Sequence, residues 1–311
     1  MAWVKRGKIF ETDGTQEWSR THTQLPIVNA VDDHIWRVYY NTRDSQKHTR
    51  PCFIEVEAGK PEHILYVHDA PLLELGELGA FDDSGVMVID VVDADGEKFM
   101  YYTGWNVRNT VPYQLSIGLA RGDGRRFEKC YTGPIVDRSP VDPFLCTSCC
   151  VMRTGDGKWN MWYTTGTGYK NVNGIVEPMY LVKYASSENG MDWRRKGEIS
   201  VALQNDHEAL GRPSVLMEDG IYKMWYSYRD IDNYRKDPTR SYRIGYAESL
   251  DGVHFARMDD RAGIDVSEDT EAWDGKMIAY GYVIRHKGKK YMFYNGNGFG
   301  QSGIGYAVWE D

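Results

Sequence analysis

Three acidic side chains stand in short segments that each precede a run of apolar residues. They are Asp83 in FDDSG, Asp142 in VDPF and Glu208 in HEALG. Two carboxyl groups that face each other raise one another's pKa, which divides them into the general acid and general base used in glycosyl transfer. We expect Asp83 to act as the base and Glu208 as the acid, because a glutamate arm can reach a leaving-group oxygen. Asp142, held extended before Pro143, would orient them.

A second set of polar and aromatic residues could hold the ligand. Aromatic faces stack on sugar rings, amides and histidines exchange hydrogen bonds with hydroxyls, and arginine binds phosphate or carboxylate with two parallel bonds. The candidates for substrate binding are His22, His48, Arg50, Trp105, Arg212, Tyr228, Arg229, Asp274 and Asn297.

The sequence predicts neither a metal site nor a cofactor. Cys146, Cys149 and Cys150 cluster in LCTSCC, but a structural zinc needs a second Cys or His pair at fixed spacing. The glycine-rich run NGNGFGQSG is followed by a strand pattern, whereas a dinucleotide loop must open a helix.

An internal repeat shows which elements position these residues. A pair of aromatic residues inside an apolar run recurs at intervals of about 62 residues. The five segments are RVYYNTR, FMYYTGW, NMWYTTG, KMWYSYR and YMFYNGN. A turn dipeptide precedes four of them, as in Asp95-Gly96 and Asp219-Gly220, which is a hairpin signal.

A second motif follows the last four pairs and supplies two more strands per unit. Its members are SIGLARGDG, LVKYASSENG, RIGYAESLDG and GIGYAVWED. No segment has a convincing amphipathic helical pattern. Four short strands repeated five times predict an all-β, five-bladed β-propeller, with residues 1–311 forming one domain.

The two ends of the chain are expected to share the last blade. The final unit stops at AVWED without a fourth strand, and Trp3-Val4-Lys5-Arg6-Gly7 resembles the fourth-strand pattern Trp193-Arg194-Arg195-Lys196-Gly197. We therefore predict that residues 2–10 close the last blade and remove two free strand edges.

The first strand of each blade lines the axis of a propeller, so the candidates near the starts of these strands should converge. Counting back from each turn places five residues at one level, within about two residues. They are His22, Asp83, Ser148, Arg212 and Tyr280.

Composition excludes several functions. A net charge of −8 argues against non-specific binding to nucleic acid or to an anionic membrane. Mean hydropathy is −0.56, and no apolar run reaches the length of about 18 residues that a transmembrane helix needs. Five scattered cysteines and an N-terminus without an apolar signal region favour a cytoplasmic location.

With the repeats placed, the chain resembles the five-bladed propeller glycosidases, a broad group of arabinanases, xylosidases, fructosidases and mannoside phosphorylases. The strings RPSVLMEDGIYKMWYSYR, YRIGYAESLDG and YMFYNGNGFGQSGIGYA look like uncharacterised propeller proteins encoded beside bacterial surface-polysaccharide genes. The resemblance implies an Asp base, an orienting Asp and a Glu acid, which Asp83, Asp142 and Glu208 could match. His22 stands where the group has an early Asp.

Three functions remain open at this point. The first is a glycosidase-like enzyme that acts on a glycan or activated sugar by inverting acid–base catalysis in the channel of the propeller. The second is a sugar phosphorylase, or an enzyme of sugar phosphates or nucleotide sugars, with an anion site of arginines and histidines. The third is a propeller that binds carbohydrate without catalysis. In each case the expected partner is a carbohydrate or activated sugar.

Overall fold

The computed structural model describes residues 2–310, most of which lie in strands. The helical elements within this range are three single turns, η1 (Pro238–Arg240), η2 (Asp259–Arg261) and α1 (Asn297–Gly300). None of the described helices is long and apolar enough to cross a membrane.

The strands pair antiparallel in four-stranded units, which we call blades and number in chain order. Blade 1 contains β2 (Thr21–Ala30), β3 (Ile35–Arg43), β4 (Thr49–Glu57) and β5 (Lys60–Val67). Blade 2 contains β6 (Gly85–Ala94), β7 (Glu97–Val107), β8 (Tyr113–Gly122) and β9 (Phe127–Lys129). Blade 3 contains β10 (Cys146–Arg153), β11 (Trp159–Val172), β12 (Ile175–Ser187) and β13 (Arg194–Val201). Blade 4 contains β14 (Glu208–Glu218), β15 (Ile221–Asp230), β16 (Arg243–Ser249) and β17 (Ala256–Arg257). Blade 5 contains β18 (Ala279–His286), β19 (Lys289–Asn295), β20 (Ile304–Glu310) and β1 (Ala2–Phe10).

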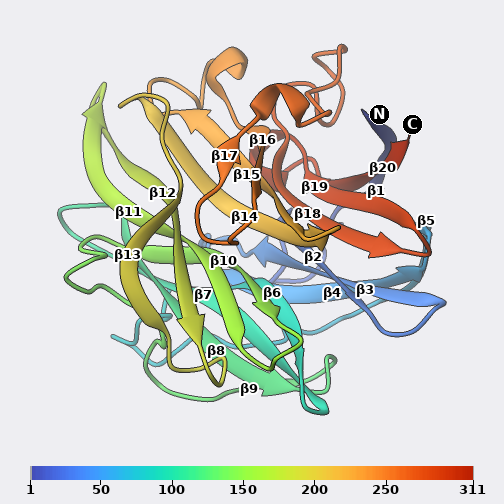
Figure 1. The fold of residues 1–311 in the computed structure, drawn as a ribbon, viewed down its shortest axis with the longest axis horizontal. Helices are drawn as coiled ribbons and strands as arrows, with labels where there is room; N and C mark the ends of the chain where they lie inside the picture. The colour runs from blue at the N-terminus through green and yellow to red at the C-terminus, as the bar shows by residue number, and fades with distance from the viewer. Residues whose placement is uncertain (1, 311) are drawn as a thin grey trace.

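The innermost strands of the blades close a ring around a central axis. Each of β2, β6, β10 and β14 contacts the first strand of the next blade, and β18 contacts β2. Figure 1 shows these five labels grouped at the centre, with β5, β9 and β13 toward the outside. A single parallel bridge between Thr49 and Gly85 also joins the sheets of blades 1 and 2. The prediction of an all-β propeller is confirmed.

The N-terminal strand completes blade 5, as predicted. β1 pairs antiparallel with β20, with Trp3 opposite Trp309. The Trp3 ring lies 5.9 Å from that of Trp225 and 5.1 Å from that of Trp309, and Trp3 is buried. β1 and β20 lie side by side in Figure 1. Non-local pairing of the two ends therefore closes the sheet and covers the apolar face between blades 4 and 5.

Each innermost strand is bulged near the end at which it begins, which we call the mouth end of the axis. A bulge frees a backbone N–H from the ladder, and a buried N–H needs an acceptor. A polar side chain near the mouth end of the preceding blade's second strand accepts it, at 2.7–3.2 Å. The pairs are Asn41 with Val88, Thr164 with Arg212, Ser227 with Tyr280 and Asn295 with Leu25.

These bonds correct the predicted level of five residues around the axis. The positions that are equivalent by pairing are Leu25, Val88, Ser148, Arg212 and Tyr280. Ser148, Arg212 and Tyr280 therefore match the prediction, but His22 and Asp83 precede the level in their blades. The cause in blade 1 is that β2 carries two pairing irregularities, which a count from the turn does not reveal.

The aromatic pairs pack between blades and also bond across them. The Tyr39 hydroxyl donates to the Gly124 carbonyl of blade 2 at 2.8 Å, and the Tyr101 hydroxyl to Gly190 of blade 3 at 2.7 Å. The Trp162 indole N–H donates to Gly252 of blade 4 at 2.7 Å. The regular recurrence of these aromatics in the sequence therefore reflects the contact between one blade and the turn of the next.

Candidate functional site

Side chains from all five blades converge at the mouth end of the axis. We call them the mouth cluster: His22 and Arg43 of blade 1, Tyr113 of blade 2, Tyr180 of blade 3, Arg229 and Tyr242 of blade 4, and Tyr280 of blade 5. They come from the starts of first and third strands and from the ends of second strands. Antiparallel pairing brings these three kinds of strand end to the same side of a blade.

Arg229 forms the wall of the mouth cluster and is fixed there by tyrosines. Its Nε lies 3.1 Å from the hydroxyls of Tyr180 and Tyr242, and these two hydroxyls also bond to each other. Its guanidinium lies 3.8 Å from the ring centroid of Tyr234, and Nη2 donates to the Pro178 carbonyl at 3.0 Å. Because Arg229 is almost fully buried, it positions the tyrosines more than it reaches solvent.

Several members of the mouth cluster are recessed yet accessible to solvent. Tyr113, Tyr180 and Tyr280 keep part of their surface exposed. Burial nevertheless raises the pKa of each of these phenols, and they perturb one another and are perturbed by the nearby arginines. These hydroxyls are therefore neutral at neutral pH and can both donate and accept hydrogen bonds.

Arg43 is a partly exposed cation in this setting. Its Nη2 donates to Gln24 Oε1 at 3.0 Å, and burial lowers the pKa of its guanidinium. Within residues 2–310, neither Arg43 nor Arg229 forms an ion pair with a carboxylate. Arg235, which also perturbs Arg43, is paired with the buried Glu177 at 2.7 Å.

His22 lies beside Arg43 at the start of β2. Burial, and then the Arg43 charge, lower the pKa of its imidazole to about 4. His22 is therefore a neutral hydrogen-bonding group at pH 7, and the predicted place of His22 near a ligand site agrees with its position in the mouth cluster.

The predicted acid–base group does not meet as free carboxylates. Asp142 has no exposed surface, and it accepts bonds from Tyr163 at 3.0 Å, Arg195 at 2.8 Å and Lys183 at 3.2 Å, all of blade 3. This correction has a physical reason: a fully buried acid with two cationic partners is neutralised in place and is closed to substrate.

Glu208 and Asp83 occupy different surroundings. Glu208 is buried and receives two bonds from Arg257 of the outermost strand β17, at 2.7 and 2.9 Å. Asp83 is partly exposed and accepts bonds from the Gly79 amide at 2.9 Å and the Ser84 hydroxyl at 2.8 Å, as a turn residue does. Each of the three acids is bonded within its own blade, and Asp142 and Glu208 are each held by the outermost strand of that blade, so their meeting at the mouth stays a prediction.

Asp142 belongs to a clasp that recurs in blades 2 to 5. A basic residue of the outermost strand binds an acid near the mouth end: Lys129 with Asp82, Arg195 with Asp142, Arg257 with Asp259 and Lys5 with Asp274. In blades 3 to 5 the second residue of the aromatic pair is a tyrosine, and its hydroxyl donates to the same acid. In blades 3 and 5 the clasp ties the segment before the inner strand to the second and outermost strands, whereas in blade 4 Arg257 reaches the inner strand through Glu208.

Two of the predicted binding residues are absorbed by such structural roles. Asp274 is buried in its clasp with Lys5 at 2.8 Å and Tyr294 at 2.9 Å. Asn297 accepts the amides of Lys276 and Met277 and donates to the Ala272 carbonyl, at 2.8–2.9 Å. Both side chains are therefore already bonded to other groups of the protein.

Others lie apart from the mouth cluster. Trp105 donates its indole N–H to Thr49 of blade 1 at 2.8 Å. Tyr228 points to the opposite face of β15 from Arg229 and lines a cavity of about 380 Å³ with Arg243 and Asp265.

His48, Arg50 and Arg212 complete the predicted set. His48 and Arg50 share Asp44 at 3.1 and 3.2 Å, and Arg50 also reaches Glu74. Arg212 is buried in the ring of inner strands, with its guanidinium 5.2 Å from the Tyr282 ring. Of the nine predicted binding residues, His22 and Arg229 are therefore the two in the mouth cluster.

Sequence reasoning missed Tyr113, Tyr180 and Tyr242. Each lies at or near the start of a third strand, which antiparallel pairing carries to the same side as the ends of the second strands. That geometry was available from the repeat and could have directed attention to them.

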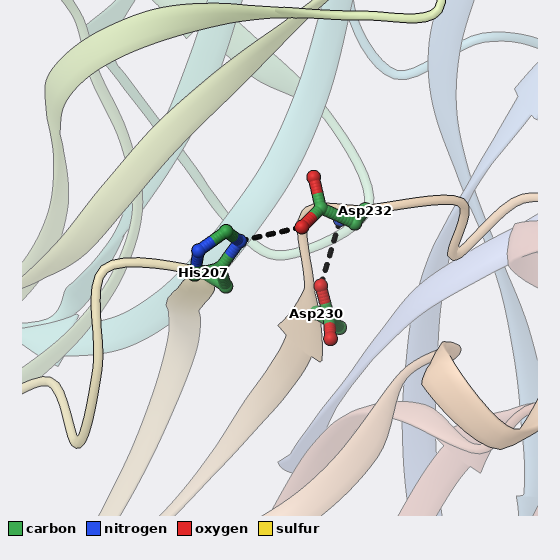
Figure 2. Close-up of side chains that lie close together, drawn as sticks. All are labelled: His207, Asp230 and Asp232. Carbon is green, nitrogen blue, oxygen red and sulfur yellow. Dashed lines mark hydrogen bonds and ion pairs between the residues drawn. The ribbon is translucent and has the colours of Figure 1, made fainter.

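A second cluster lies between blades 3 and 4. Figure 2 shows the His207 imidazole directed at Asp232, with Nδ1 2.5 Å from Oδ2, and Asp230 accepting the Asp232 amide at 2.7 Å. The donor atoms of the three residues lie within 4.8 Å of one another, a set that suits a divalent cation. Arg240 already pairs with Asp230 at 3.1 Å and Lys170 Nζ lies 3.4 Å from His207 Nδ1, so a metal would have to displace both cations.

Comparison with known sequences finds relatives across the entire chain. The uncharacterised Mycobacterium tuberculosis proteins Rv1502 (strain H37Rv) and MT1551 (strain CDC 1551) are each 35% identical over 313 residues, which cover 100% of both proteins. No protein-family model matches the sequence.

Comparison with solved structures finds the same fold in carbohydrate-active proteins. A structure described as a glycoside hydrolase superposes with a TM-score of 0.75 at 19% identity, over 99% of this protein and 91% of that one. A structure from the GH130 family of mannoside phosphorylases, described as containing hydrolases of β-1,2-mannosidic linkages, has a TM-score of 0.64 at 18% identity, over 100% and 90%. At this level of identity the likeness establishes the propeller fold.

Proposed function

The protein belongs to the same family as the M. tuberculosis protein Rv1502, and we propose that it binds and processes a saccharide at the mouth cluster. The fold that it shares with glycoside hydrolases and a mannoside phosphorylase family supports a carbohydrate ligand. A structure described as a complex with RGII, with a TM-score of 0.74, is a further neighbour of this kind.

One observation carries the proposal: partly exposed tyrosines from three blades converge with Arg43 at one end of the axis. Tyrosine rings offer flat apolar faces to the C–H faces of a sugar, and their hydroxyls bond to sugar hydroxyls. The buried Arg229 holds Tyr180, and the buried Tyr242 beside it, in place before a ligand arrives, which lowers the entropic cost of binding.

The test is a glycan-binding screen of the wild-type protein and of Tyr113→Ala. Loss of one stacked ring should lower the affinity for the glycan about tenfold. The matched control is Tyr131→Ala, which removes an exposed tyrosine of the same blade outside the mouth cluster. Failure to bind any saccharide, or equal binding by the two variants and the wild type, would contradict the proposal.

A specific observation favours His207 and Asp232 as the acid–base pair of an enzymatic version of this function. Asp232 Oδ2 accepts the bond at Nδ1, which orients the imidazole and leaves Nε2 to take a proton from water or a sugar hydroxyl. The cluster lies at the mouth end, because His207 precedes β14 and Asp232 follows β15.

This second candidate is tested on any saccharide that the protein turns over. His207→Gln and Asp232→Asn should each lower kcat by about a hundredfold with little change in KM. His254→Gln is the matched control, because His254 pairs with Asp251 at 3.0 Å on a turn at the opposite end of blade 4. Unchanged kcat in the two mouth variants would exclude the pair.

A further inference from the structure

We propose that the saccharide carries an anionic group, a carboxylate or a phosphate, which binds at Arg43. The sugar part of this inference rests on the proposed function above, whereas the anion part rests on the charges around Arg43. It narrows the ligand from carbohydrates in general to acidic or phosphorylated saccharides.

The mouth cluster is positive in a protein that is negative as a whole. The net charge of the protein is −8, yet Arg43 and Arg229 have no carboxylate partner within the described residues. Arg235 and Glu177 neutralise each other nearby. Local positive potential in a recessed place attracts an anion even when the rest of the surface repels it.

Arg43 differs from the recessed arginines that are paired with acids. Arg37 is bound to Glu55 at 2.7 Å, Arg195 to Asp142 at 2.8 Å and Arg257 to Glu208 at 2.7 Å. Arg43 uses one N–H, toward Gln24, out of five donors. The remaining donors of this partly exposed guanidinium are open to solvent, and a bound anion could accept from two of them in parallel.

The neighbours of Arg43 suit an anion that is attached to a sugar. Neutral His22 and the hydroxyls of Tyr113 and Tyr280 can donate to anion oxygens without adding a competing negative charge. The aromatic faces of the same tyrosines would contact the sugar ring. Carboxylate and phosphate share this chemistry, so the experiment must separate them.

The experiment measures binding of four probes by isothermal titration calorimetry: glucuronate, glucose 1-phosphate, inorganic phosphate and glucose. At least one of the sugar anions should bind tenfold or more tightly than glucose, because a charge-assisted bond contributes about that factor. Raising the salt concentration should weaken the binding of the anions and leave the affinity for glucose unchanged.

Arg43→Gln should abolish the preference for the anion, and Arg43→Lys should recover part of it, since lysine keeps the charge and loses the fork. Arg126→Gln is the control, because Arg126 is exposed at a turn at the opposite end of the blades. Thermal unfolding of each variant shows whether it is folded. The salt dependence of binding by the wild type tests the inference even if a variant does not fold.

The outcomes separate the two proposals. If glucose binds as well as the anions and Arg43→Gln changes nothing, the inference is wrong and the proposed function stands. If inorganic phosphate binds as tightly as glucose 1-phosphate, and glucose and glucuronate do not bind, Arg43 is an anion site and the proposed function loses its support. Binding of none of the anions overturns the inference.

Discussion

Arg43 and Asp142 show two different uses of a charged side chain in this fold, one open at the axis and one paired inside a blade. Asp142 is fully buried with Arg195, Lys183 and Tyr163 around it, so its charge is used to hold strands. Arg43 is partly exposed at the axis and bonds to an amide. A charge that is neutralised inside one blade contributes to stability, and a charge left open at the meeting point of five blades is available to a ligand.

Asp142→Asn should therefore cost stability. Removing one charge from a buried cluster leaves Arg195 and Lys183 uncompensated and lowers the free energy of unfolding by about 3 kcal/mol or more. Asp83→Asn, at a partly exposed turn, should cost less than about 1 kcal/mol. Urea unfolding of the two variants measures the difference. Equal stability of Asp142→Asn and the wild type, with loss of activity, would restore the catalytic assignment.

His22 gives the pH dependence of the site. Its folded pKa, about 4, lies below the value of about 6.5 expected for an unfolded histidine. Between these values the unfolded state binds more protons, so the free energy of unfolding rises with pH and the contribution of neutral His22 is lost as the pH falls toward 4.

His22→Gln should reduce the slope of stability against pH between pH 4 and 6.5, as measured by urea unfolding across that range. The exposed His34 provides the control variant His34→Gln, which should leave the slope unchanged. An identical slope in His22→Gln and the wild type would show that His22 does not titrate at a lowered pKa.

What the sequence could reveal about residues was limited by long-range pairing. Asp142 and Glu208 were correctly placed near the starts of inner strands, but their partners Arg195 and Arg257 come from outermost strands about fifty residues later. No local pattern connects such residues, so neutralised acids resemble free ones in a sequence. His22 and Arg229 do lie at the mouth end, because strand ends at one side of a propeller meet, and their role in binding stays a prediction.

At the scale of elements, the blade is held by its clasp and by the bonds to the next blade. The repeat predicted the strand order and the closing role of residues 2–10, since aromatic pairs and turn dipeptides recur in register. The bulges could not be predicted, because each depends on an acceptor in the preceding blade, such as Ser227 for the Tyr280 amide.

β1 offers a direct test of closure. Trp3→Ala should lower the free energy of unfolding by about 3–5 kcal/mol, because it opens a cavity between Trp225 and Trp309. Val4→Ala, at the neighbouring position on the exposed face, should cost less than about 1 kcal/mol. Chemical denaturation followed by tryptophan fluorescence compares them. Similar small losses in both variants would mean that β1 adds little to blade 5.

At the scale of the whole molecule, fivefold convergence creates the site. Each blade contributes one or two side chains to the mouth cluster. The mouth ends of the five blades bring His22, Arg43, Tyr113, Tyr180, Tyr242 and Tyr280 around one axis. Ring closure therefore sets the geometry of the site, and damage to closure should weaken binding as well as stability.

The measurement that tests this account most directly is a crystal structure of the protein with the tightest-binding saccharide from the glycan screen. We predict that the sugar lies at the mouth end of the axis, in contact with Tyr113 and Tyr280, with its carboxylate or phosphate on Arg43. A saccharide bound instead against Asp142 and Glu208, or in the cavity beside Tyr228, would contradict the central claim.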